Sequence, residues 1–327
     1  MSKILTIVIP AYNVADYIEQ CLNSLVKNRI EEIEVLVIDD GSKDDTYQIA
    51  KGYEDKYPEV IKAVHKENGG HGSTINKGLE LATGKYFRVL DGDDWFDEEA
   101  LEKLLGILND SDSDLVLTDV IQVFPDNTNR QRFFTELERG RIYDLDKLPQ
   151  IDYLTMGAVA VKTDILKSNK VHITEKCYYV DIEYNTYCLA YSHTIQIEDL
   201  PLYMYRLGNS SQSTVKANMY RNIEMLKKVS LGMANFFENI NPGDGTRKEL
   251  MLLRIGKLVR TTMLLYLADS NSRKGFNGWK EYRELARKAS GTIYKYINNK
   301  WMVIRIICTG NRLIFKLMSI AYKHREM

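Results

Sequence analysis

The sequence has few cysteines, and their spacing matches neither a metal site nor a disulfide framework. Only four occur in 327 residues, namely Cys21, Cys177, Cys188 and Cys308. This excludes a disulfide-stapled secreted domain and a cysteine-based zinc module as predictions. The N-terminal stretch MSKILTIVIPAYN also lacks the apolar run that follows the positive charge of a signal peptide. We therefore expect free thiols and a cytoplasmic location.

Long apolar runs are absent as well. No stretch reaches the roughly 18 uninterrupted apolar residues that a membrane-spanning helix requires. The nearest candidate, WMVIRIICTGNRLIFKLMSIAY, is interrupted by Arg305, Asn311, Arg312 and Lys316. The sequence contains no internal repeat, no low-complexity linker and no G-x-x-x-x-G-K-[ST] motif, so neither a repeat protein nor a P-loop nucleotide-binding protein is predicted.

The overall charge conceals a strong difference between the two ends of the chain. The net charge is −1, but residues 241–327 hold 18 basic and 6 acidic residues, whereas residues 1–240 hold 26 basic and 39 acidic ones. Hydrophobic residues make up 44% of the chain and charged residues 27%, as in ordinary folded proteins. The composition predicts a folded protein with an acidic body and a basic C-terminal part.

The first half of the chain alternates strand patterns with helix patterns. ILTIVIP (residues 4–10) and EVLVIDD (residues 34–40) are β-branched runs without polar alternation, as in strands that are buried on both faces. Helical spacing follows each of them, and residues 61–66 and 85–91 predict two more strands. This alternation predicts an α/β domain with a mostly parallel sheet, in which ligands bind beyond the carboxyl ends of the strands.

The last third has a different pattern. From about residue 217 to the end, apolar residues recur at steps of three and four, as in MYRNIEMLKKVSLGMANFF, which is typical of helices. We place a boundary near residue 215, which gives a catalytic domain over residues 1–215 and a helical region over residues 216–327.

Three aspartates directly follow the predicted strand Tyr86 to Leu90. In the stretch FRVLDGDDWFD these are Asp91, Asp93 and Asp94. Carboxylates this close repel one another, so the repulsion must be offset by the solvation of a turn or by a cation. DGDD and the stretch DDGS at residues 39–42 both lie at carboxyl ends of predicted strands, where a ligand would bind.

Four motifs together resemble family 2 inverting glycosyltransferases with a GT-A fold. These are TIVIPAYN, VIDDGSKDDT, ENGGHGSTINKGLELATGKYFRVLDGDDWF and YVDIEYN, in the order that this family shows, and the resemblance covers roughly residues 4–210. It implies a Rossmann-like α/β sheet flanked by helices, a nucleotide-sugar donor and a divalent metal, Mg²⁺ or Mn²⁺.

The resemblance implies a role for each matching residue around the diphosphate. Asp91 and Asp93 match the metal-binding D-x-D motif, with Asp93 as the direct ligand, and Gly92 leaves room for the ribose and diphosphate. Many relatives have Ala-Arg-Asn where this chain has Thr-Ile-Asn at residues 74–76, so His71 or Lys77 would replace the missing arginine. His71 could equally be a hydrogen-bonded loop residue.

The same resemblance assigns the nucleotide base. Pro10 and Tyr12 belong to the first motif, and Tyr12 would stack on a uracil ring. Asp40 would accept a hydrogen bond from the uracil N3–H, and Asp39 would support the turn or bind the ribose. The preference for a UDP-sugar rests on what is usual in the family.

Two further positions complete the implied site. Asp181 matches the family's general base, with Glu183 as the reserve, because inversion needs one base at the acceptor hydroxyl. Arg206 follows a tyrosine, as in relatives that close a serine-rich loop over the diphosphate, and Ser210 to Ser213 would form that loop. The competing interpretations are an ordinary amphipathic helix around Asp181 and a surface position for Arg206.

The implied function is metal-dependent transfer of a hexose from a UDP-sugar to a hydroxyl of a glycan or polyprenyl-linked oligosaccharide, in bacterial surface polysaccharide synthesis of the cell envelope. The basic C-terminal segment WMVIRIICTGNRLIFKLMSIAYKHR predicts peripheral contact with the inner face of the cell membrane, or packing on protein such as a homodimer partner. No recognised nucleic-acid-binding module is present, so no nucleic-acid partner is predicted.

Two other classes stay open from the sequence. A nucleotidyltransferase also combines an α/β sheet with acidic metal ligands, but IPAYNVADY lacks its glycine-rich, basic loop after the first strand. A non-catalytic nucleotide-sugar-binding protein of the same fold is the other, because Ile75 and Val180 depart from common family patterns.

Overall fold

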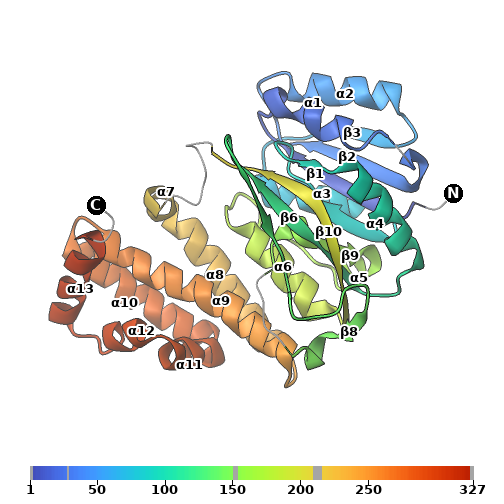
Figure 1. Ribbon diagram of the computed structural model, residues 1–327. Coiled ribbons are helices and arrows are strands. Elements are labelled where there is room, and N and C mark those ends of the chain that lie inside the picture. Colours follow the sequence, from blue (N-terminus) through green and yellow to red (C-terminus); the bar gives the residue numbers. More distant parts are fainter. Residues whose placement is uncertain (1–2, 28, 150–153, 209–215, 325–327) are drawn as a thin grey trace. The chain divides into compact units, whose positions relative to one another are not determined.

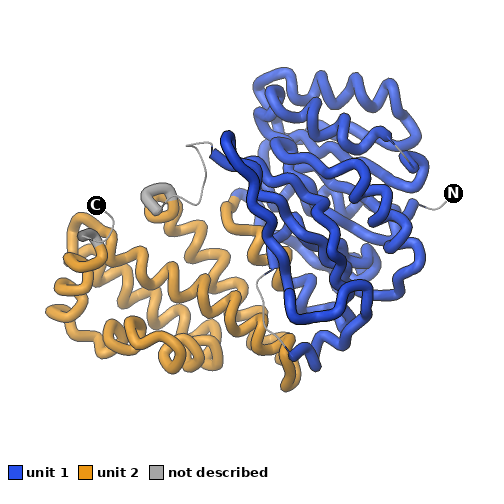
Figure 2. Tube along the Cα trace, in the orientation of Figure 1, with its two compact units in different colours: residues 1–176, 187–210 blue, residues 177–186, 211–327 orange. Residues whose placement is uncertain are grey.

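The computed structural model describes residues 3–27, 29–149, 154–208 and 216–324. The chain forms two compact units, shown in different colours in Figure 2. The first consists of residues 1–176 and 187–210, and the second of residues 177–186 and 211–327. The second unit therefore includes fifteen residues that the sequence analysis placed in the catalytic domain, residues 177–186 and 211–215.

The first unit is built on one large sheet. Along the sheet the strands run in the order β3-β2-β1-β4-β9-β6-β10-β5, with β7 beside β6 and β8 beside β10. The strands are β1 Leu5–Ala11, β2 Ile33–Asp39, β3 Ile61–His65, β4 Tyr86–Val89, β5 Trp95–Phe96, β6 Leu115–Val123, β7 Thr128–Gln131, β8 Ile142–Asp144, β9 Val159–Lys162 and β10 Thr194–Arg206.

The sheet is mixed and mostly parallel, which confirms the fold prediction. β1 pairs in parallel with β2 and β4, β2 with β3, and β6 with β10. All seven residues of β1 are buried, as expected for a strand covered on both faces. The antiparallel pairings of β9, β5, β7 and β8 did not emerge from the sequence pattern, because β5 and β8 are too short to show a period.

Helices of the first unit pack on this sheet through apolar faces. α4 buries leucines three and four residues apart, and it contacts β10, whereas α3 contacts β1 and β2. The helices are α1 Ala15–Asn23, α2 Thr46–Lys56, α3 His71–Leu81, α4 Glu98–Asp110 and α5 Thr163–Ser168, and α6 Val180–Tyr191 is divided between the two units. Short 3₁₀ turns cover Ile30–Glu32, Leu145–Lys147 and Met156–Ala158.

The described part of the second unit after residue 215 is helical, which confirms the predicted C-terminal helical region. α8 and α9 are long and lie side by side (Figure 1). The helices are α7 Lys216–Arg221, α8 Ile223–Ile240, α9 Thr246–Leu265, α10 Ser272–Ala289, α11 Gly291–Lys300, α12 Met302–Ile307 and α13 Arg312–His324, with a 3₁₀ turn at Tyr266–Ala268. Among the described residues, no helix combines the length and the apolar character needed to cross a bilayer.

A side chain caps the N-terminus of α4. Asp97 is its N-cap, and the Oδ1 atom accepts a hydrogen bond from the backbone N–H of Ala100 at 2.9 Å. Because Asp97→Ala leaves that donor without its acceptor, we expect a loss of about 1 kcal/mol in the free energy of unfolding by urea denaturation. Asp97→Asn keeps an oxygen acceptor and serves as the control; an equal loss in both variants would contradict the cap as the cause.

Candidate active site

The carboxyl ends of three neighbouring strands bring the sequence motifs together. Ala11, the last residue of β1, is level with Asp39 at the end of β2, and the N–H of Asp40 donates to the carbonyl of Ala11 at 2.8 Å. On the other side of β1, the N–H of Gly92 donates to the carbonyl of Pro10 at 3.2 Å. The residues after β1, β2 and β4 therefore share one edge of the sheet, as the parallel order requires.

Tyr12 and Gly92 show what this edge can accommodate. Tyr12 follows β1 directly and is 50% exposed, so its ring is open to a ligand. A Cβ at Gly92 would lie 3.1 Å from the carbonyl oxygen of Pro10 and 3.1 Å from a methyl group of Val14. Glycine at this position lets the aspartate turn approach the end of β1 closely.

Asp94 is the buried member of the three aspartates. Its Oδ2 atom accepts a hydrogen bond from the Tyr203 hydroxyl at 2.6 Å, and its Oδ1 atom accepts one from the backbone N–H of Arg206 at 2.8 Å. Burial, reinforced by the charges of Asp91 and Asp93, raises the pKa of Asp94 to about 8. Asp94 therefore ties the turn to the end of β10 and is largely protonated at neutral pH.

Asp91 and Asp93 are half-buried and differ in their partners. The Oδ1 atom of Asp91 lies 2.8 Å from Nε2 of His71, at the start of α3. Burial, with the charge of Asp91 next, raises the pKa of Asp93. Because Asp94 is largely protonated, charge repulsion remains only between the carboxylates of Asp91 and Asp93. Asp91 has His71 beside it.

These two carboxylates fit a divalent cation. Mg²⁺ and Mn²⁺ take hard oxygen ligands, and Mg²⁺ is commonly held by one or two carboxylates together with water and phosphate oxygens. Within the described ranges, no group of three or more histidine, cysteine or acidic side chains is arranged as a metal site. A cation held by Asp91 and Asp93 would therefore need further oxygen ligands, from water or phosphate.

The Asp40 carboxylate accepts hydrogen bonds from the glycine loop before α3. Its Oδ1 atom accepts from the N–H of Gly69 at 2.9 Å and from Nζ of Lys66 at 2.7 Å, and its Oδ2 atom accepts from the N–H of Gly70 at 2.7 Å. Gly70 has φ +80, which favours glycine. Asp40 is 3% exposed, so a nucleotide base would have to use the remaining capacity of Oδ2. Lys66 was not among the predicted site residues.

Asp39 supports the turn after β2. Its carboxylate is fully buried, and Oδ2 lies 2.5 Å from Nδ1 of His65, the last residue of β3. Both carboxylate oxygens also lie 3.4 Å from the backbone nitrogen of Ser42. The Tyr47 ring lies 5.2 Å from the His65 ring. Nothing in the sequence singles out His65, because only strand pairing brings it beside Asp39.

Arg206 is fixed beside the aspartate turn by two aromatic rings. Its guanidinium carbon lies 4.9 Å from the ring centre of Tyr17 and 4.7 Å from that of Trp95. Its Nε donates to the carbonyl of Asp93 at 2.9 Å, and Nη2 donates to Oε1 of Gln20 at 2.6 Å. A guanidinium has five N–H donors, so others remain for a phosphate. Three aromatic residues were not predicted as site residues, since aromatic residues within helices and strands usually indicate packing; they are Tyr17 in α1, Trp95 in β5 and Tyr203 in β10.

His71 and Lys77, the two candidates for the missing arginine, lie in different surroundings. His71 contacts Asp91, so it belongs to the aspartate cluster. Lys77 instead pairs with Glu80 one turn further along α3, at 2.8 Å. The contacts therefore favour His71 over Lys77 as a residue near the diphosphate.

The remaining predicted positions belong to the second unit or fall outside the described residues. Asp181 and Glu183 are in the first turn of α6 and belong to the second unit, within which Asp181 is half-buried and Glu183 is buried. Burial, followed by Tyr178 and Asp181, raises the pKa of Tyr179. The role of Asp181 stays a prediction, and Ser210 to Ser213 lie outside the described residues.

The mixed, mostly parallel sheet, with polar motifs where β1, β2 and β4 end, has the GT-A type of α/β architecture. A family model described as glycosyl transferase family 2 matches residues 6–168. The chain belongs to this family.

Curated relatives share parts of the chain. It is 26% identical over 230 residues to the uncharacterized glycosyltransferase YibD of Escherichia coli, which covers 67% of this chain and 66% of that protein. It is 27% identical over 220 residues to the minor teichoic acid biosynthesis protein GgaB of Bacillus subtilis, which covers 65% of this chain. The match spans only 24% of GgaB, so the activity of the whole relative does not transfer directly.

Solved structures show the same fold. Crystal structures of S. aureus TarS 1–349 align over 98% of this chain and 91% of that chain, with a TM-score of 0.67 and 17% identity. The complex of the same protein with UDP-GlcNAc aligns over 90% of this chain and 92% of that chain, with a TM-score of 0.58 and 19% identity. At this identity the likeness establishes the fold alone, and it agrees with the predicted GT-A architecture.

The titration of Asp94 predicts how stability depends on pH. The pKa of an unfolded aspartate is about 3.9, below the value of about 8 in the folded chain. The folded chain therefore binds more protons between these values, and the free energy of unfolding falls as the pH rises from about 4 to about 8, by at most about 1.4 kcal/mol per pH unit.

Asp94→Asn removes this titration, so its free energy of unfolding should depend less on pH over the same range. The measurement is urea denaturation at several pH values in the presence of a chelator. The control is Asp126→Asn, which changes an exposed aspartate in the connection from β6 to β7. Parallel pH curves for wild type and Asp94→Asn would contradict the raised pKa.

Proposed function

We propose that this chain is an inverting, metal-dependent glycosyltransferase that moves a hexose from a UDP-sugar to a hydroxyl of a glycan or polyprenyl-linked oligosaccharide. The single observation that carries the proposal is the pair Asp91 and Asp93 at the edge where β1, β2 and β4 end. Cation–π contacts with Tyr17 and Trp95, and a hydrogen bond to the Asp93 carbonyl, hold the Arg206 guanidinium beside this pair. Two anionic oxygens and one fixed cation suit a metal-bound diphosphate.

The comparisons support the donor and the biological setting. One protein of the same fold, TarS, has been crystallised with UDP-GlcNAc, and a relative, GgaB, is named for minor teichoic acid biosynthesis. We infer a UDP-sugar donor and a role in bacterial surface polysaccharide synthesis. The acceptor would be presented at the inner face of the cell membrane, with the chain acting there as a cytoplasmic, peripheral protein.

In the proposed mechanism, Asp93 and Asp91 would hold Mg²⁺ or Mn²⁺, which when bound neutralises charge on the departing diphosphate. His71 orients Asp91 through the contact at 2.8 Å. Asp94 and Tyr203 hold the turn against β10, so the two carboxylates keep their spacing. Because metal ligands must be ionised, a neutral Asp94 is suited to a structural role beside two charged neighbours.

The donor and acceptor would be positioned by the remaining residues. Tyr12 stacks on the uracil ring, Asp40 accepts from its N3–H, and free N–H groups of Arg206 bind phosphate oxygen. Asp181 removes the proton from the acceptor hydroxyl as its oxygen attacks the anomeric carbon, and UDP leaves from the opposite face, which inverts the configuration.

Two alternatives make different predictions. A non-catalytic nucleotide-sugar-binding protein would bind the donor without forming product, and a nucleotidyltransferase would consume a nucleoside triphosphate and release pyrophosphate. Asp91 and Asp93 could bind a metal and phosphate oxygens in all three, and the match of residues 6–168 to glycosyl transferase family 2 favours the transferase. Homodimer formation is a further proposal that the proposed chemistry does not require.

Asp93→Asn should weaken metal-dependent donor binding, because an amide is a poorer ligand than a carboxylate for a hard cation. We expect UDP to bind the wild type in the presence of Mn²⁺, and the affinity to fall by about tenfold or more in the variant. The measurement is calorimetry with UDP, GDP and CDP, with and without Mn²⁺. Asp126→Asn is the control, and UDP binding that ignores both Mn²⁺ and Asp93 would contradict the metal assignment.

Asp181→Asn should lower the rate of sugar transfer by about 10² to 10⁴, because the side chain can no longer accept the proton of the acceptor hydroxyl. UDP binding should be unchanged. The measurement is release of UDP from a panel of UDP-sugars with glycan acceptors. Asp164→Asn, which changes an exposed carboxylate in the first turn of α5, is the matched control. Full transfer by Asp181→Asn would overturn its role as the base.

A further inference from the structure

α12 and α13 expose large apolar side chains to solvent. On α13, Leu313 is 66% exposed, Leu317 is 59% exposed and Ile320 is 48% exposed. They are spaced by four and three residues, so they form one row along the helix. The exposed apolar residues of α12 are Met302, Val303 and Ile306. A row of exposed apolar side chains such as that on α13 indicates an interaction site.

The row on α13 lies opposite the face that anchors the helix. The Phe315 ring is 1% exposed and lies 5.4 Å from the ring of Phe276 and 5.7 Å from that of Trp279. The Ser319 hydroxyl donates to the carbonyl of Leu267 at 2.7 Å. One face of α13 is thus packed on the second unit, and the apolar row is a second face that packing within this unit does not explain.

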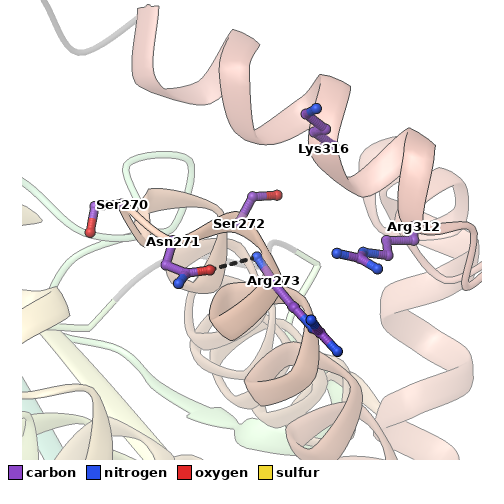
Figure 3. Close-up of a pocket in the computed structure, with 6 residues that line it drawn as sticks. All are labelled: Ser270, Asn271, Ser272, Arg273, Arg312 and Lys316. Carbon is purple, nitrogen blue, oxygen red and sulfur yellow. Dashed lines mark hydrogen bonds between the residues drawn. The ribbon is translucent and has the colours of Figure 1, made fainter.

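A basic hollow lies beside this row. It has a volume of about 510 Å³, and its lining comes from two elements, the start of α10 with the turn before it, and α13 (Figure 3). Its charged side chains are Arg273, Arg312 and Lys316, and among the described residues no acidic side chain lines it. Within the part of the chain that the structure describes, none of these three side chains makes a hydrogen bond or an ion pair, although ion pairs are frequent elsewhere in the unit.

Asp269, which precedes Ser270 of the hollow in the sequence, already accepts hydrogen bonds within the second unit. Asp269 is 5% exposed, its Oδ2 atom accepts from the Tyr220 hydroxyl at 2.6 Å, and its Oδ1 atom accepts from the N–H of Asn271 at 2.8 Å. In the sequence, no aspartate or glutamate occurs between Glu284 and Glu326. The positive charge of the hollow is therefore not balanced by an acidic side chain of residues 216–324.

We propose that α12, α13 and the start of α10 form a docking surface for an anionic lipid bilayer. The apolar row enters the interface between headgroups and acyl chains, and Arg273, Arg312 and Lys316 bind the phosphate of an anionic headgroup. A lipid surface offers apolar depth and negative charge side by side, which is the combination that this surface presents.

A second copy of the chain fits this surface less well. In a two-fold dimer the same patch meets itself, so the three cations would approach their equivalents with no acid between them. A bilayer that contains anionic lipid has the opposite charge. The charge of the hollow therefore favours the membrane over self-association.

The inference deepens the proposed function, and it rests on that function for the membrane-linked acceptor. Lipid binding is measured without donor or acceptor, so either proposal can fail while the other holds. The probe is a phosphatidylcholine vesicle with about 30 mol % phosphatidylglycerol, compared with pure phosphatidylcholine, in a sedimentation assay with the full chain. We expect binding to the anionic vesicles that weakens as salt is raised.

Two pairs of substitutions separate the charge from the apolar contact. Arg312→Glu with Lys316→Glu should lower partitioning by about tenfold or more, and Leu313→Gln with Leu317→Gln should lower it similarly even at low salt. All four side chains are exposed, so we expect these variants to fold. The control is Lys228→Glu with Lys288→Glu, which makes the same change of net charge on exposed positions of α8 and the last turn of α10.

The outcomes are distinct. Loss of binding in both test variants with retention in the control supports the docking surface. Equal loss in the control would mean that net charge alone drives binding, and would overturn it. Binding to neither vesicle, with a change of oligomeric state by light scattering in Leu313→Gln with Leu317→Gln, would assign the surface to a second copy instead.

Discussion

The candidate active site depends on the hydrogen bonds that the buried Asp94 carboxyl group makes. This group accepts hydrogen bonds from the Tyr203 hydroxyl and the Arg206 backbone, so it joins the turn after β4 to the last residues of β10. These two segments are more than a hundred residues apart in the sequence. Because burial keeps Asp94 largely neutral, it can hold the turn without adding a third charge beside Asp91 and Asp93. The close pair that remains is chemically suited to a shared metal.

The residues around Asp91 and Asp93 are held in place by neighbouring side chains. Asp94 fixes the turn, His71 contacts Asp91, and two aromatic rings hold Arg206 against the carbonyl of Asp93. On the neighbouring strand, Asp40 organises the glycine loop from which α3 and His71 begin. Each group that would meet a ligand is thus positioned by a neighbouring side chain, which is how a site keeps its geometry before a ligand arrives.

The two proposals give the two units complementary tasks. The first unit has the edge of carboxylates that suits a nucleotide-sugar, and the second has a basic and apolar surface that suits a lipid headgroup. A transferase that acts on a polyprenyl-linked acceptor would need both, because its donor is dissolved in water and its acceptor stays in the bilayer. The charge of the chain is divided in a similar way, because the acidic residues predominate before residue 241 and the basic residues after it.

The sequence by itself determined the parallel strands, the helical C-terminal region and the place of Asp91 and Asp93 directly after a strand, because periodicity and motif order are local properties. It did not reveal that Asp94 is structural, that Asp40 is bonded to Gly69 and Gly70, or that His65 supports Asp39. It indicated a basic, apolar end of the chain, but not which face of α13 is free. Only the tertiary structure decided these points, because burial and hydrogen-bond partners come from segments that are distant in the chain and adjacent in space.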